Sequence, residues 1–202
     1  MTFSVMLITA GSKTIKAIDV TNSAKTANTS AKVVVNPRSY FQLLALLPSQ
    51  SNVPGTVDGV SGNPAIPARG VAFTIQVRAV DQYFNPVNGI TNELTFSSSD
   101  GSASLPANTS LLASSFRVLS FTITNSGIQT VTINDPIAGK SVTVNIPNPT
   151  PVSLATNYFR TVVSGLWTDA ATWESSVDNI VWHAATLFPV ATANKITILS
   201  PH

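Results

Sequence analysis

Carboxylates at the ends of strands are the residues of this 202-residue sequence best placed to bind a metal ion. Asp81, Asp100 and Asp135 each follow a run of alternating apolar residues, and strand-end loops can converge on one pole of a β-sandwich. Because calcium takes about six to eight oxygen ligands from carboxylates and carbonyls, these three are candidate calcium ligands. The alternative is that each caps backbone amides in its own turn. No other cofactor is expected.

Three tryptophans near the end of the chain form a second candidate site. Trp167, Trp173 and Trp182 lie within one short segment. Aromatic faces stack on planar or hydrophobic ligand surfaces, so these residues are candidate carbohydrate contacts. The alternative is that they fill the core of a small β-rich unit.

The residues that carry most enzyme chemistry are scarce. The sequence has no cysteine and only two histidines, His183 and His202, which excludes thiolate sites and leaves little material for a histidine triad. The only glutamates, Glu93 and Glu174, fall in different segments, so no carboxylate pair suits glycoside hydrolysis. We therefore expect a non-catalytic protein.

Charge and hydropathy exclude two kinds of partner. Only 10% of the residues are charged, with a formal net charge of +2, and no three consecutive residues include two Lys or Arg. A nucleic-acid surface needs clustered basic residues, so no nucleic-acid partner is expected. No apolar run approaches the roughly 18 residues that would cross a membrane.

An internal repeat organises the sequence. Residues 5–19 align without gaps on residues 121–135, and both copies later reach an Asn-Pro pair. The identical aligned pairs are Gly11 and Gly127, Thr14 and Thr130, and Asp19 and Asp135. We therefore expect residues 1–36 to be the closing strands of one truncated module, and residues 38–150 to be the next module, complete.

The complete module has the pattern of short antiparallel strands. In residues 71–80, Phe73, Ile75, Val77 and Ala79 alternate with polar residues, which predicts a half-buried strand. Similar runs separated by turn residues give about seven strands, the pattern of an immunoglobulin-like sandwich. Residues 48–70 are expected to form a loop inside this sandwich, with a boundary between modules as the alternative. The predicted class is all-β, with tandem Ig-like modules.

The same residues resemble a known family. Residues 79–85 (AVDQYFN), 94–107 (LTFSSSDGSASLPA) and 121–135 (FTITNSGIQTVTIND) are similar to the bacterial Ig-like repeats of large secreted and surface proteins. Phe84 stands where those repeats have Gly, which indicates a differently shaped turn. The resemblance implies tandem extracellular architecture and says little about a ligand.

The C-terminal segment resembles a different module. Residues 158–202 contain SGLWTDAATWESSVDNIVW, which is similar to the opening of a β-rich unit in extracellular multi-domain proteins of Bacteroidetes-type bacteria. The matching residues are Trp167, Thr172, Trp173, Glu174, Ser175 and Trp182. The resemblance implies that residues 158–202 are the N-terminal part of such a unit.

These observations lead to one hypothesis and one rival. The hypothesis is a non-catalytic structural or adhesive spacer of a secreted or cell-surface bacterial protein. Its partners would be neighbouring Ig-like modules, together with extracellular or cell-surface glycans or proteins. The rival is an ancillary carbohydrate-binding region of a secreted polysaccharide-acting enzyme, with the three tryptophans as contacts.

Overall fold

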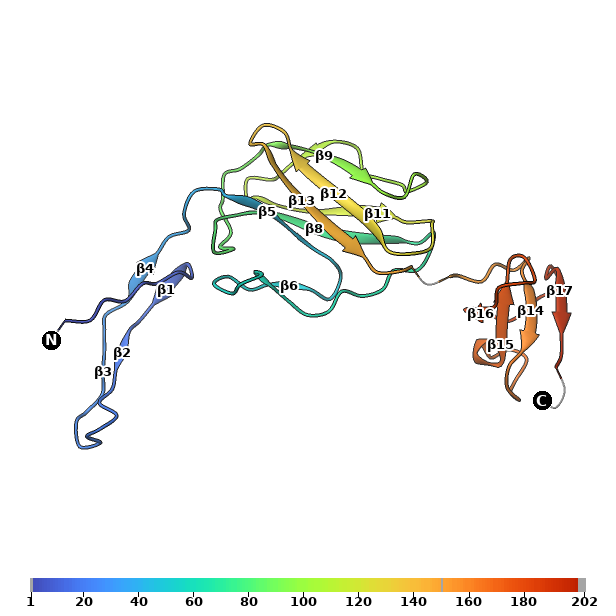
Figure 1. Ribbon diagram of the computed structural model, residues 1–202, viewed down its shortest axis with the longest axis horizontal. Coiled ribbons are helices and arrows are strands. Elements are labelled where there is room, and N and C mark those ends of the chain that lie inside the picture. The colour runs from blue at the N-terminus through green and yellow to red at the C-terminus, as the bar shows by residue number, and fades with distance from the viewer. Residues whose placement is uncertain (1, 150, 200–202) are drawn as a thin grey trace.

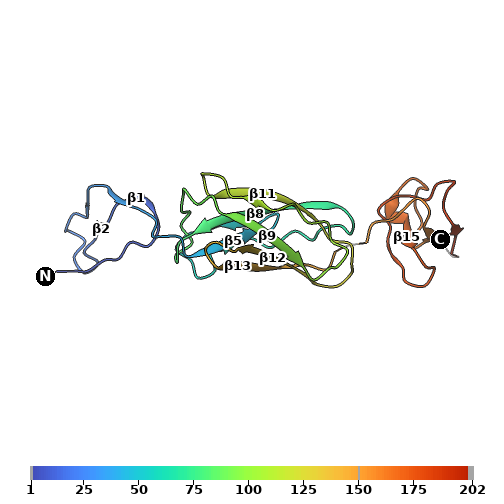
Figure 2. The ribbon, with the colours of Figure 1, turned by 90° about the horizontal axis from the view of Figure 1, so that it is seen from above.

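In the part that the structure describes, the chain folds into β-strands and turns, with one short 3-10 turn. The computed structural model describes residues 2–149 and 151–199, so the last three residues of the predicted unit 158–202 lie outside the described part. A hairpin, a sandwich and a small sheet follow one another in an elongated row, with the hairpin and the small sheet at opposite ends of the sandwich (Figures 1 and 2). The predicted all-β class is confirmed.

The first unit is a long two-stranded hairpin. Its strands pair as β1 with β4 and β2 with β3, both antiparallel. Most of its side chains are exposed, because two strands alone cannot enclose a core. Each arm of the hairpin contains two short strands. The first arm holds β1 (Gly11–Lys13) and β2 (Lys16–Ala17), and the returning arm holds β3 (Asn28–Thr29) and β4 (Val33–Val35).

The tip of this hairpin shares a detail with the second copy of the sequence repeat. Oδ1 of Asp19 accepts a hydrogen bond from the N–H of Asn22, three residues ahead. The aligned Asp135 accepts one from the N–H of Ala138, also three residues ahead. The aligned aspartates therefore begin their hairpin turns in the same way.

The central unit is built from two antiparallel sheets that face each other across one core. One sheet has the order β10-β9-β12-β13 and the other β11-β8-β5, an arrangement of the β-sandwich type (Figure 1). The strands are β5 (Gln42–Leu46), β8 (Ala72–Val80), β9 (Glu93–Ser98), β10 (Thr109–Ser110), β11 (Phe116–Thr122), β12 (Gln129–Asp135) and β13 (Lys140–Ile146).

The core follows from the two-residue period of the strands. In β8, Ile75, Val77 and Ala79 are fully buried, while the intervening residues are partly buried or exposed, as the alternation predicted. Phe121 packs between Phe73 and Phe96, with ring centroids 6.4 and 5.8 Å away. The other large core residues are Leu43, Leu47, Leu94, Leu111, Leu119, Ile123, Val131, Ile133 and Ile146.

The segment of residues 48–70 joins two strands of the same sheet. β5 pairs with β8, so this segment is a loop within the sandwich. It carries a small hairpin of β6 (Ser51–Asn52) and β7 (Val60–Ser61). Val60 packs against the buried outer residues Leu44 and Leu46, which gives the sandwich a second, smaller core.

The last unit is a four-stranded sheet of order β16-β15-β14-β17, in which only β14 and β17 run parallel. Before β15 the chain makes the 3-10 turn η1 (Ala170–Thr172), which Asp169 caps. The strands are β14 (Tyr158–Thr161), β15 (Trp173–Ser176), β16 (His183–Ala184) and β17 (Lys195–Thr197). Across the described residues, no helix has the length and apolar character needed to cross a membrane.

Candidate functional site

Asp81 directly follows strand β8 and is enclosed by hydrogen-bond donors. Its side chain is fully buried. Oδ1 accepts from the N–H groups of Tyr83 and Asn85 at 2.8 and 2.9 Å, and Oδ2 accepts from the N–H of Arg38 at 2.8 Å. The side-chain amide of Asn85 donates to both oxygens, at 3.2 and 3.0 Å.

This environment favours the ionised form of Asp81. Burial by itself raises the pKa of a carboxyl group. The hydrogen bonds from Arg38, Asn85 and Tyr83 outweigh burial and hold the pKa of Asp81 below its ordinary value. The residue is therefore a buried anion neutralised by backbone and amide dipoles.

Asp135 is the last residue of strand β12, at the same pole of the sandwich as Asp81. It connects three segments of the chain there. It accepts hydrogen bonds from the hydroxyl of Tyr40 at 3.1 Å and from the amide of Asn92 at 2.9 and 3.1 Å. Burial, and then the negative charge of Asp135, raise the pKa of the Tyr40 phenol well above its usual range. The phenol therefore stays protonated and serves as a donor.

Asp100 follows strand β9 and closes the loops at the opposite pole. It is 3% exposed, and its oxygens accept from the N–H groups of Ser102, Thr124 and Asn125 at 2.9, 2.7 and 3.0 Å. Burial raises the pKa of Asp100, but the hydrogen bonds from Asn125, Thr124 and Ser102 lower it below its ordinary value. This carboxylate stabilises a turn, as the alternative interpretation expected.

The structure does not bring the three candidate calcium ligands together. Asp81 follows the last residue of β8. Asp100 accepts a hydrogen bond from Thr124, just after the end of β11, and that end of β11 pairs with the first residues of β8. A nine-residue strand spans roughly 30 Å, so these two carboxylates lie at opposite ends of the sandwich. Among residues 2–149 and 151–199, no three His, Cys, Asp or Glu side chains gather as a metal site. The three aspartates do not form one ligand set.

Trp167 and Trp173 pack against each other on one face of the C-terminal sheet. Their ring centroids are 4.8 Å apart with an interplanar angle of 73°. Trp173 is 2% exposed and donates its Nε1–H to the carbonyl of Trp167, whose own Nε1–H binds the carbonyl of Pro189. Trp173 is therefore a core residue, while Trp167 remains 46% exposed above it.

Trp182 contacts a different group of side chains. The guanidinium of Arg160 lies over its ring, with Cζ 4.4 Å from the centroid. The same guanidinium donates to Oε2 of Glu174 at 2.6 and 2.8 Å. Cation–π contact and ion pair together fix the half-buried Trp182 against β14 and β15.

These two groups lie on opposite faces of the sheet. Arg160 pairs with Glu174 and the next residue, Thr161, pairs with Trp173. Neighbouring residues of a strand point to opposite faces, so Trp182 and Trp173 are separated by the sheet. The three tryptophans therefore do not form one platform. A hollow of about 150 Å³ lies beside Trp167 and Trp173, and the 46% exposed ring of Trp167 makes it the part of this set most open to a ligand.

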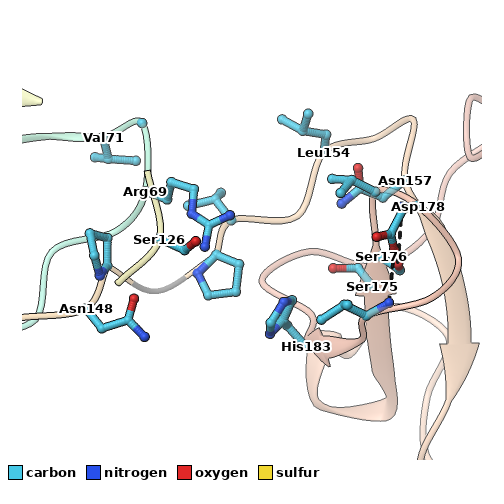
Figure 3. A pocket seen from close by; sticks show the side chains of 16 residues that line it. Arg69, Val71, Ser126, Asn148, Leu154, Asn157, Ser175, Ser176, Asp178 and His183 are labelled. Atoms are coloured by element: carbon cyan, nitrogen blue, oxygen red, sulfur yellow. Dashed lines mark hydrogen bonds between the residues drawn. The ribbon is translucent and has the colours of Figure 1, made fainter. Parts of the chain in front are cut away.

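A larger groove separates the sandwich from the C-terminal sheet. It has a volume of about 810 Å³, and Figure 3 shows side chains of both units facing it across open space. The groove carries Arg69, Val71, Ser126 and Asn148 on one side and Leu154, Asn157, Asp178 and His183 on the other.

The opposite end of the sandwich is joined to its neighbour by direct hydrogen bonds. Asn85 is 2% exposed, and its side-chain amide binds the backbone of Ile8 and Ala10 in the first unit. Sequence reasoning did not single out Asn85 as a site. The only local signal is its place four residues after Asp81 and just before Pro86.

The turn that presents Asn85 has an unusual backbone. Phe84 has a φ of 62°, the left-handed conformation that glycine favours. A phenylalanine in this conformation is strained. The packing of its ring over Gly59 and against Leu44, Leu46 and Val80 holds the turn in place.

Comparison with known proteins does not assign the chain to a family. No protein-family model matches it, and no curated protein matches it significantly. The resemblance to bacterial Ig-like repeats remains a prediction from the residues that carry it.

Proposed function

We propose that this chain is a non-catalytic spacer of a secreted or cell-surface bacterial protein, built from tandem Ig-like modules that present other domains. The observation that carries the proposal is the linear order of the three β units, with the sandwich between the other two (Figures 1 and 2). A unit that is joined to its neighbours at opposite poles adds length to the molecule. The internal repeat and the resemblance to extracellular Ig-like repeats support the same function.

The buried carboxylates fit a structural role. Asp81, Asp100 and Asp135 each bind backbone N–H groups of the loops at the poles. A catalytic carboxylate must reach a substrate, whereas these three are almost completely enclosed. Their geometry stabilises the loops through which one module meets the next.

The second candidate function is carbohydrate binding, and the exposed ring of Trp167 favours it. The hollow beside this ring is lined by Val163, Gly165 and Thr172 and is smaller than most pockets for organic ligands, which measure roughly 300–1,000 Å³. A sugar would therefore be held on a shallow surface.

Retention on soluble and insoluble polysaccharides separates the two functions. The spacer predicts that the intact chain is not retained. Retention that Trp167→Ala abolishes would overturn it in favour of carbohydrate binding, provided that the circular dichroism spectrum is unchanged. Trp182→Ala is the matched control, because it removes the tryptophan from the other face of the same sheet.

A further inference from the structure

The hydrogen bonds between the first two units join one side chain of the sandwich to two backbone groups of the hairpin, and Gly55 lies beside them against Thr9. Oδ1 of Asn85 accepts from the N–H of Ala10 at 2.7 Å, and Nδ2 donates to the carbonyl of Ile8 at 2.8 Å. A planar amide thus satisfies a backbone donor and acceptor two residues apart, as a neighbouring strand would. Asn85 itself is buried, at 2% exposed, and the two hydrogen bonds to the hairpin are partly buried.

Asp81 fixes the direction in which this amide points. Both carboxylate oxygens lie within hydrogen-bond distance of Nδ2 of Asn85. A carboxylate only accepts hydrogen bonds, so the NH₂ group must face Asp81 and the oxygen must face the neighbouring unit. Asn85 is therefore preorganised to bind a free N–H beside a free carbonyl.

The sequence repeat places the same backbone groups at the other pole of the sandwich. Ile8 and Ala10 align with Thr124 and Ser126, and each segment is followed by a glycine with positive φ, 109° at Gly11 and 85° at Gly127. Within the described part of the chain, the carbonyl of Thr124 and the N–H of Ser126 have no hydrogen-bond partner. The far pole thus offers the donor and the acceptor that Asn85 binds at the near pole.

We propose that the turn of residues 124–126 is a docking site for the Asp81–Asn85 loop of a further copy of this sandwich. The inference rests on the proposed spacer function, which it deepens by naming the partner. The sandwich then has complementary poles, and copies joined head to tail repeat the contact that Asn85 makes with residues 8–10.

A duplicated chain tests the proposal. Residues 1–148 are followed directly by residues 37–202, so that Asn148 precedes Pro37 as Asn36 does naturally. Because the chain has no cysteine, spin labels can be placed at will. One label replaces Ile137 in the first copy and the other Val118 in the second, both at exposed positions. Double electron–electron resonance then gives the distance distribution across the new junction.

The proposal predicts a single narrow distance peak. Asn85→Ala in the second copy should abolish that peak, whereas Asn88→Ala, an exposed asparagine at the same pole, should leave it unchanged. Ser126→Pro in the first copy removes the backbone donor from an exposed turn position and should also abolish the peak. This second variant keeps the test valid if Asn85→Ala fails to fold.

The contrary results are distinct from a failure of the spacer function. A broad distribution across the new junction with Asn85 intact would overturn the docking site. The natural junction, labelled at Thr21 and Val118, is measured in the unduplicated chain. A narrow peak there alongside a broad one in the duplicated chain would refute docking and leave the spacer intact. Broad distributions at both junctions would contradict the spacer as well.

Discussion

The ring of Phe84 lies directly over Gly59, so that a methyl group at position 59 would overlap the ring. Gly59 itself has a φ of 68°. The contact fixes the loop of residues 48–70 against the turn that presents Asn85. The joint between the first two units therefore depends on a glycine that is distant from Asn85 in sequence.

Gly59→Ala tests this dependence. The substitution adds left-handed strain of about 1–2 kcal/mol and an overlap that costs a further ~1–3 kcal/mol. Gly89→Ala is the matched control, because its φ is 84° but nothing lies within 4 Å of an added methyl group. Urea unfolding should show a clearly larger loss at Gly59, and equal losses would refute the packing role of Phe84.

Asp81→Ala should destabilise the sandwich. It leaves the N–H groups of Arg38, Tyr83 and Asn85 without their acceptor. The Asn85 N–H is buried, and an unsatisfied buried polar group costs about 1–3 kcal/mol. Asp58→Ala removes a carboxylate from an exposed loop position and should change the free energy of unfolding little. Similar denaturation midpoints for the two variants would contradict the account.

Stability should fall in acid. The folded-state pKa values of Asp81 and Asp100 are lowered, so both contribute fully above the unfolded pKa of about 3.9. This contribution is lost as the pH falls below that value and through the folded-state pKa. Asp100→Asn should flatten the dependence of the free energy of unfolding on pH in this range. An unchanged slope in the variant would show that Asp100 does not titrate as expected.

The first hairpin should exchange its amide hydrogens much faster than the sandwich. Val131 is fully buried in β12, whereas the aligned Ile15 is 37% exposed, and Ala17 is also exposed. Local opening of the hairpin therefore costs little, while the amides of β8 and β12 exchange only through larger unfolding. Hydrogen exchange followed by mass spectrometry checks this, and equal protection in the two units would show that the hairpin is covered in solution.

Alternation within a strand was enough to predict the core of the sandwich. Ile75, Val77 and Ala79 are buried as the pattern of residues 71–80 indicated, since a strand with one apolar face has a single way to bury it. The all-β class followed from the same pattern.

The arrangement of the candidate sites depends on contacts that are remote in sequence. Asn85 meets Ile8 and Ala10 more than 70 residues away, and no local pattern encodes that pairing. The side of the sheet taken by Trp182 depends on which strand residues pair across β14 and β15. Residue type alone marked the tryptophans as candidate ligand contacts. It could not show that Trp173 lies in the core while Trp167 is exposed.

The central claim is that the three units form an extended spacer, and small-angle X-ray scattering of the intact chain tests it most directly. A compact chain of this length would have a radius of gyration of roughly 17 Å. Three units in a row should give a clearly larger value and a pair-distance distribution with a long tail. A symmetric distribution with a radius of gyration near the compact value would contradict it.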